Sequence, residues 1–98
     1  MPGQRLLIVD DEANLRSMLS AALRHHGFEV TAADNGRQSL DQVAGDQPDL
    51  IVLDVMMPDL DGFEVCRRLR ASGVQTPILF LTARDGTEDK VRGLTLGG

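Results

Sequence analysis

Four short apolar runs alternate along this chain with segments whose apolar residues recur at helical spacing. The runs cover residues 5–9, 28–32, 50–53 and 78–81. Three of them are continuously apolar, as in strands buried on both faces, whereas 28–32 alternates apolar with polar residues, as in a strand at the edge of a sheet. Strands that alternate with helices predict an α/β fold with a doubly wound parallel sheet.

The expected helices have recognisable ends. The first helix carries apolar residues spaced three and four apart, from Leu15 to Leu23. It is expected to stop at Gly27, because glycine suits a helix C-terminus. The others are expected to begin after Asn35-Gly36, after Gly62 and near Asp85. A strand order of 2-1-3-4 places the alternating run at one edge, but it leaves the apolar run 78–81 at the other. Since an apolar edge strand is an aggregation hazard, we expect a fifth strand to be missing.

Length and composition narrow the class of protein. Ninety-eight residues suit one domain. No apolar run approaches the ~20 residues of a membrane span, and no signal-peptide pattern opens the chain. The single cysteine, Cys66, excludes an internal disulfide, fits a reducing cytoplasm and is interpreted as core filling. The net charge of −5 argues against binding of nucleic acid by this piece itself.

Polar residues follow three of the apolar runs. Asp10 and Asp11 come after the first run, Asp54 after the third and Thr82 after the fourth. Ligands of doubly wound sheets bind beyond the carboxyl ends of the strands where the winding reverses, here between strands one and three. Neighbouring strands lie ~4.8 Å apart, so these carboxylates are expected within reach of one divalent cation.

Such a cluster suits Mg²⁺, because like charges oppose one another's ionisation and Mg²⁺ prefers oxygen ligands. Asp54 is then placed to attack a phosphorus atom. The simpler alternative is a helix cap for Asp10 or Asp11 and a turn or cap role for Thr82. The convergence of three strand ends favours the functional interpretation.

These residues resemble the three signature stretches of response-regulator receivers. The stretches are Ile8-Val9-Asp10-Asp11-Glu12, 53–58 with Asp61-Gly62, and Leu81-Thr82-Ala83. The resemblance implies a flavodoxin-like fold of strand order 2-1-3-4-5, in which Asp54 accepts phosphate from the phosphohistidine of a sensor histidine kinase. It implies a Mg²⁺ site formed by Asp11, Asp54 and the backbone carbonyl of Met56, with Asp10 contributing through water. Thr82 would be the switch hydroxyl, Ala83 would leave access to phosphate, and Pro58 and Gly62 would shape the loop. A receiver of this kind is not an enzyme with a separate substrate but a switch that catalyses its own phosphotransfer and dephosphorylation.

Within that family, residues 62–70 and 81–85 resemble the OmpR/PhoB-type subfamily in particular. The resemblance implies a cytoplasmic transcription regulator with a C-terminal winged-helix domain that makes the DNA contacts, and no membrane partner. It also implies a homodimer through the fourth-helix face, where Asp89 and Lys90 are candidates for intersubunit salt bridges or are simply solvated. The family's fifth strand and helix, with a lysine that bonds the phosphoryl group, have no counterpart here. We therefore expect a receiver domain over residues 1–98, truncated after the fourth helix, with weak Mg²⁺ binding and poor switching. From the exposed apolar strand 78–81 we expect self-association, domain swapping or disorder.

Two other functions compete with this one. Hydrolases of the haloacid-dehalogenase type place the nucleophile after strand one and a second acid two residues later, whereas here Asp10 and Asp11 are adjacent and Asp54 lies after another strand. A metal-free pseudo-receiver usually lacks these acids, and this chain retains all three. The pair His25-His26 is a poor chelate because neighbours on a helix point ~100° apart, so both are expected in solvent.

Overall fold

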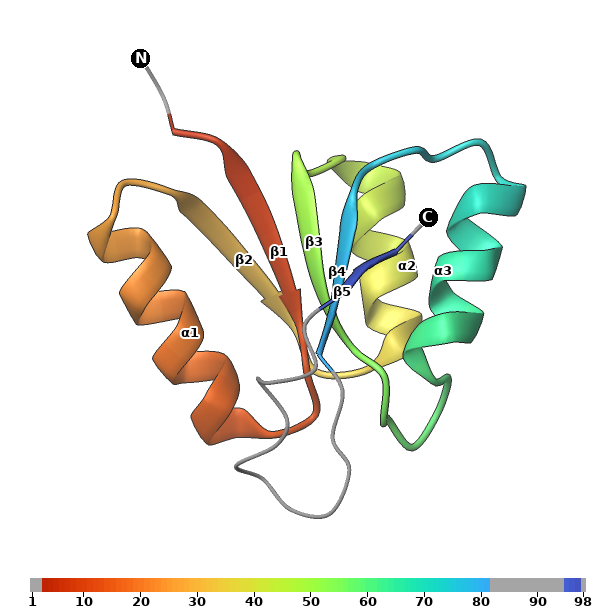
Figure 1. The fold of residues 1–98 in the computed structure, drawn as a ribbon, viewed down its shortest axis with the longest axis horizontal. Coiled ribbons are helices and arrows are strands. Elements are labelled where there is room, and N and C mark those ends of the chain that lie inside the picture. Colours follow the sequence, from red (N-terminus) through yellow and green to blue (C-terminus); the bar gives the residue numbers. More distant parts are fainter. Residues whose placement is uncertain (1–2, 82–94, 98) are drawn as a thin grey trace.

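The computed structural model describes residues 3–81 and 95–97, and it shows one sheet between two layers of helices (Figure 1). The elements are β1 (Arg5–Val9), α1 (Ala13–His25), β2 (Glu29–Ala33), α2 (Gly36–Gly45), β3 (Leu50–Asp54), α3 (Gly62–Ala71), β4 (Ile78–Leu81) and β5 (Thr95–Gly97). The strands are ordered β2-β1-β3-β4-β5, and the first four run parallel. The predicted α/β class and the order 2-1-3-4 are therefore confirmed.

Beyond β4 the sheet contains a short strand that was not predicted. β5 pairs with β4 in the antiparallel sense, with Phe80 opposite Thr95 and Ile78 opposite Gly97. It differs from the fifth strand that the resemblance implies, because that strand belongs to a parallel sheet. The open edge of a sheet presents a row of unpaired N–H and C=O groups. Here β5 pairs with three residues of β4, Ile78 to Phe80, and covers that part of the edge. The helix expected to begin near Asp85 lies outside the described residues.

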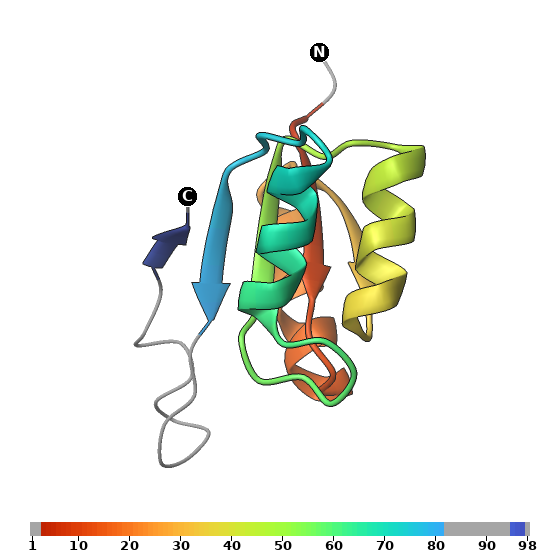
Figure 2. The same ribbon diagram turned by 90° about the vertical axis from the view of Figure 1, so that its right-hand side faces the viewer.

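The sheet has a separate apolar core on each face, because successive side chains of a strand point to opposite sides. Leu6 and Ile8 of β1 face α1, where they pack with residues such as Leu23. Leu7 and Val9 belong to the core that contains Val43 of α2 and Val65 of α3. Figure 2 shows these two helices on the same side of the sheet. The buried thiol of Cys66 belongs to this second core, which confirms its interpretation as core filling.

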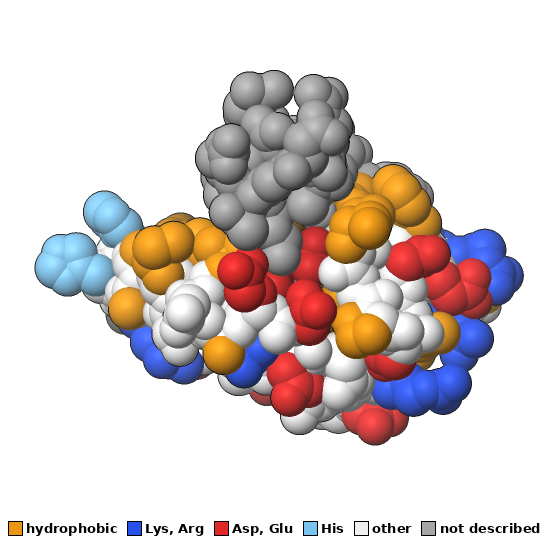
Figure 3. Space-filling model, turned by 90° about the horizontal axis from the view of Figure 1, so that it is seen from below, with side chains coloured by type: hydrophobic (Ala, Val, Ile, Leu, Met, Phe, Trp, Pro, Cys, Tyr) orange, Lys and Arg blue, Asp and Glu red, His pale blue; other side chains and the backbone are white. Residues whose placement is uncertain are grey.

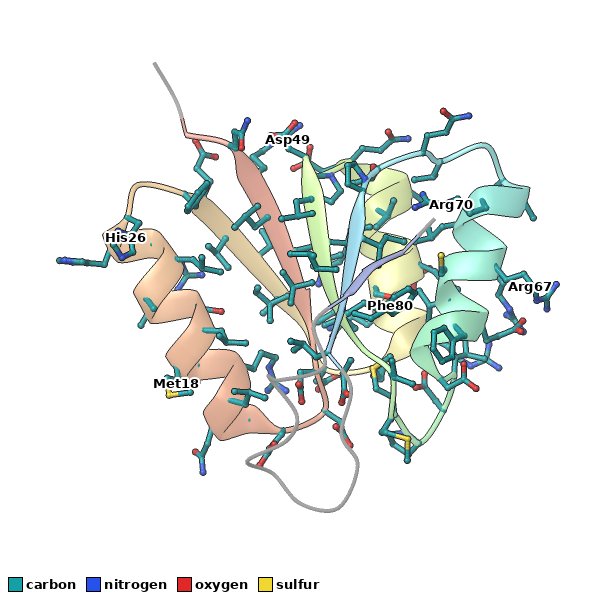
Figure 4. All side chains as sticks on the ribbon, viewed as in Figure 1. Met18, His26, Asp49, Arg67, Arg70 and Phe80 are labelled. Carbon is teal, nitrogen blue, oxygen red and sulfur yellow. The ribbon has the colours of Figure 1, made fainter. Side chains whose placement is uncertain are left out.

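Polar and apolar side chains lie where the fold leaves them exposed or buried. Figure 4 shows Met18 and His26 pointing away from the sheet and Phe80 lying between β4 and α3. The ring centroid of Phe80 lies 4.9 Å from that of Phe63. His25 and His26 are both exposed, as expected. In the described part of the chain, no helix is both long and apolar enough to cross a membrane.

Local capping explains where the helices begin and end. Gly27, with φ of 95°, follows α1 in the left-handed conformation that favours glycine at helix C-termini. The side chain of Asn35 accepts a hydrogen bond of 2.8 Å from the backbone N–H of Gln38 at the start of α2. The side chain of Asp61 does the same for Glu64 of α3, also at 2.8 Å. Both caps satisfy backbone donors that a helix cannot bond internally.

Candidate functional site

Three aspartates come together at the carboxyl edge of the sheet. Asp10 and Asp11 follow β1, and Asp54 is the last residue of β3. One carboxylate oxygen of each lies within 4.8 Å of the others. Asp10 and Asp54 are fully buried, whereas Asp11 is exposed to solvent. The predicted meeting of these side chains at one edge is therefore confirmed.

The strand register places the two buried acids side by side. β1 and β3 are paired up to Val9 and Leu53, so Asp10 and Asp54 occupy the next positions. The N–H of Asp10 donates to the carbonyl of Ala33 at 3.2 Å, which extends the pairing toward β2. Both acids are thus held by the central strands.

Each buried carboxylate also organises the chain that follows it. Oδ1 of Asp10 accepts a hydrogen bond of 2.8 Å from the N–H of Glu12, and the guanidinium of Arg16 donates to the Asp10 carbonyl at 2.7 Å. Oδ1 of Asp54 accepts a longer bond of 3.2 Å from the N–H of Met56. The N-cap of α1 is Glu12, so Asp10 is not the helix cap that was its simpler alternative; its carboxylate bonds the N–H of that cap residue in addition to its place in the cluster.

Gly62 closes the loop that follows Asp54. Its N–H donates to the carbonyl of Val55 at 2.9 Å. A Cβ at this position would lie 2.5 Å from the carbonyl oxygen of Asp54 and 2.9 Å from the Cα of Val55. Because both neighbours are backbone atoms, only glycine fits here without displacement of the strand end, which supports the predicted role of Gly62 in shaping the loop.

An open pocket of about 540 Å³ lies beside the cluster. Among the described residues, its walls are formed by Asp11, Val55, Met56, Met57, Pro58, Asp61 and Phe63. Figure 3 looks onto this end of the molecule, where acidic side chains gather near its centre. Asp11 belongs both to the cluster and to the pocket, so a group bound in the pocket can reach the acids.

The donor chemistry of the cluster fits a hard divalent cation. It offers carboxylate oxygens only, from three residues at one point. Mg²⁺ and Ca²⁺ take oxygen ligands, and Mg²⁺ in particular binds through one or two carboxylates while it keeps several waters. The pocket leaves room for such waters. The three aspartates could therefore hold a metal ion.

One contact near the site was not predicted. The carboxylate of Asp59 accepts hydrogen bonds from the N–H groups of Gly36 and Arg37, each at 3.0 Å. Partial desolvation raises the pKa of Asp59, but hydrogen bonds from the backbone of Gly36 and Arg37, together with those from Leu60 and Asp59 itself, more than offset it, so the pKa lies below its ordinary value. No sequence motif marks this contact, because it joins a loop to the start of a helix 22 residues away.

Thr82 and Ala83, and the interface candidates Asp89 and Lys90, lie outside the described residues. Met56, in contrast, is 61% exposed and lines the pocket.

Comparison with known proteins adds an independent line of argument. Residues 6–98 match the family model described as response regulator receiver domain. The response regulator MprA of Mycolicibacterium vanbaalenii is 52% identical over 93 residues, which are 95% of this chain and 40% of that protein. The chain thus spans less than half the length of such relatives.

Solved structures agree on the fold. The receiver domain of the Francisella response regulator 1452 has a TM-score of 0.81 at 32% identity, covering 93% of this chain and 75% of that one. The response regulator TrrA of Thermotoga maritima, solved in complex with Mg²⁺ and BeF, has a TM-score of 0.76 at 36% identity. That match covers 84% of this chain and 71% of that one.

Proposed function

This chain belongs to the response regulator receiver family, and from that premise we propose that Asp54 accepts a phosphoryl group from the phosphohistidine of a sensor histidine kinase. One observation carries the proposal. The buried carboxylate of Asp54 ends a central strand within 4.8 Å of those of Asp10 and Asp11, beside an open pocket. An acid that served only as a helix cap would not need two further acids at the same point.

The proposed step is a displacement at phosphorus. An oxygen of the Asp54 carboxylate forms a bond to the phosphorus atom, the bond from phosphorus to the imidazole nitrogen breaks, and its electron pair stays on that nitrogen. Such a transfer depends mainly on positioning and on neutralisation of charge. Dephosphorylation is the attack of water on the same phosphorus atom, which returns the carboxylate and releases phosphate.

The residues around Asp54 have distinct proposed roles. Asp11, Asp54 and the backbone carbonyl of Met56 would hold Mg²⁺ directly, and Asp10 would hold it through water. When bound, Mg²⁺ neutralises charge on the acids and on the phosphoryl oxygens. The structure of the similar protein TrrA was solved with Mg²⁺ and BeF, which supports a Mg²⁺ site in a receiver of this fold. Thr82 is proposed as the hydroxyl that bonds the phosphoryl group and starts the conformational switch.

We further propose that residues 1–98 are the receiver of a longer, cytoplasmic regulator. This chain resembles OmpR/PhoB-type regulators, and it covers 40% of the length of the response regulator MprA of Mycolicibacterium vanbaalenii. A DNA-binding winged-helix domain after the receiver is consistent with the net charge of −5, which disfavours DNA contact by the receiver itself. Phosphorylation would control that domain through dimerisation on the fourth-helix face, with Asp89 and Lys90 as interface residues.

Mass spectrometry tests the phosphoacceptor. The chain is incubated with acetyl phosphate and Mg²⁺, digested and mapped, with Asp54→Asn and an EDTA-treated sample as controls. We expect one phosphoryl group on the peptide that contains Asp54, and none in either control. A phosphoryl group on another residue, or equal labelling of Asp54→Asn, contradicts the proposal. Turnover of p-nitrophenyl phosphate would instead favour a hydrolase.

A further inference from the structure

We propose that Asp59 is a positioning residue for the metal site, because it ties the loop after Asp54 to the start of α2. The inference rests on the proposed function in one respect, namely that Mg²⁺ binds at Asp54 and the Met56 carbonyl. Asp59 itself would not touch the metal. It would act through the backbone that carries Met56.

The tie is a helix cap supplied from outside the helix. Oδ1 of Asp59 accepts from the N–H of Gly36 at 3.0 Å, and Oδ2 accepts from the N–H of Arg37 at 3.0 Å. The helix's own N-cap, Asn35, serves a third donor, the N–H of Gln38. Residues 35 and 59 therefore share the backbone donors of the first turn, which have no partner within a helix. The negative charge of Asp59 also suits the positive end of the helix dipole.

The loop and the helix are in close contact at this point. A Cβ on Gly36 would lie 2.8 Å from Cβ of Leu60 and 2.9 Å from Cγ2 of Val65. No side chain can therefore separate the start of α2 from the loop. At its far end, the loop is closed by Gly62 against the carbonyl of Asp54. Movement of Asp59 away from α2 would thus loosen a segment whose two ends are tightly packed.

Met56 lies in this segment, three residues before Asp59. The buried side chains of Met57 and Leu60 also hold the loop against the core. However, apolar contacts are not directional, whereas hydrogen bonds fix the orientation of the groups that they join. Without Asp59 we expect the loop to remain packed but its backbone to lose a defined orientation. The long bond from the N–H of Met56 to Asp54, at 3.2 Å, would weaken first.

Three variants of the 98-residue chain separate this role from general stability and from charge. Asp59→Ala removes the tie. Asn35→Ala is the matched control, because it removes a cap from the same turn of α2 but leaves the loop untouched. Asp59→Asn removes the negative charge and keeps one carbonyl oxygen as an acceptor.

Isothermal titration with MgCl₂ is the first measurement. Loss of a partner that orients a metal ligand costs roughly 10–100-fold in affinity, and we expect about tenfold weaker binding for Asp59→Ala. Asn35→Ala should bind as the original chain does, and Asp59→Asn should fall between the two. Equal weakening by Asp59→Ala and Asn35→Ala, or an unchanged affinity in Asp59→Ala, would overturn the proposal.

Amide hydrogen exchange without metal is the second measurement. We expect the N–H of Met56 to exchange about tenfold faster in Asp59→Ala, in parallel with the loss expected in affinity. Asn35→Ala should leave its exchange rate unchanged, and unchanged exchange in Asp59→Ala would overturn the tie. If the original chain binds no Mg²⁺, the metal step of the proposed function fails, while this measurement still decides whether Asp59 orders the loop. If Asp59→Ala does not fold, the same comparison is made with Asp59→Asn.

Discussion

Replacing Gly62 with alanine tests how tightly the backbone is held around Asp54. The added methyl group would lie 2.5 Å from the carbonyl oxygen of Asp54, about 0.9 Å inside the 3.4 Å at which ordinary contact begins. The nearest atoms, the carbonyl oxygen of Asp54 and the Cα of Val55, both belong to the backbone and not to a flexible side chain. The end of β3 or the start of α3 must therefore move. Any such movement displaces the residue that is proposed to accept phosphate.

The cost can be estimated from two opposing terms. Inserting a methyl group into a packed region costs roughly 1–3 kcal/mol. Alanine is favoured over glycine in a helix by up to about 1 kcal/mol, and residue 62 is the first residue of α3. The two terms together span a fall of roughly 0–3 kcal/mol in the free energy of unfolding, and we expect a value near the middle, about 1–2 kcal/mol. For a chain of this size, that corresponds to a melting temperature lower by roughly 4–16 °C.

Urea unfolding followed by circular dichroism measures this loss, with and without MgCl₂. Gly45→Ala is the control, because it adds a methyl group to a helical glycine whose surroundings are open: no atom lies within 4 Å of a Cβ at this position. The φ angle of Gly45 is not positive, so this control should gain about 0.4–1 kcal/mol. If Gly62→Ala unfolds at the same urea concentration as the original chain and binds Mg²⁺ equally well, the contact is not tight and the reasoning is wrong.

Other consequences are open to measurement. Asp54→Asn removes one of three like charges, so without metal it should raise the free energy of unfolding by about 1–3 kcal/mol and abolish the rise in melting temperature with Mg²⁺; a lower stability would contradict this. The pKa of Asp59 is below its ordinary 3.8, so the stability that its charge contributes is present above that pH and is lost as the pH falls through the lower folded value. The difference in unfolding free energy between the original chain and Asp59→Asn, measured by urea unfolding at a series of pH values, should therefore shrink from about pH 5 to pH 3. A difference that stays constant would show that the charge of Asp59 does not contribute to stability. The buried thiol of Cys66 should react with a disulfide reagent only as fast as the chain opens, and rapid reaction of the native protein would contradict its burial.

The sequence predicted the parts of the fold that depend on local pattern and on strand topology. Runs such as 50–53 are apolar throughout because both faces of their strand are covered, and this burial is confirmed for Ile51 to Leu53. The acid cluster was predictable because the carboxyl ends of parallel strands meet at one edge, whatever the details of packing. The alternating run at 28–32 was located within one residue of β2.

The remaining features depend on packing that no short pattern encodes. The contact of Asp59 with α2 is fixed by the path of a loop between two buried side chains, and an aspartate in such a loop looks like any other turn residue. β5 is three residues long and is formed by pairing with an open edge, so its position depends on β4 and not on its own sequence. Both are tertiary effects.

The acids of the site and the loop beside it are supported in different ways. Asp54 ends β3 and Asp10 directly follows β1, and the side chains of both strands enter both cores, so the separation of the two acids is as rigid as the sheet itself. The pocket wall from Val55 to Phe63, in contrast, belongs mostly to a surface loop. Substitutions of its exposed residues Met56 and Pro58 can therefore alter the surroundings of the proposed phosphoacceptor with little penalty in folding, whereas the buried Met57 and the helix cap Asp61 are held by the fold. The same scaffold can in this way serve signals of very different duration.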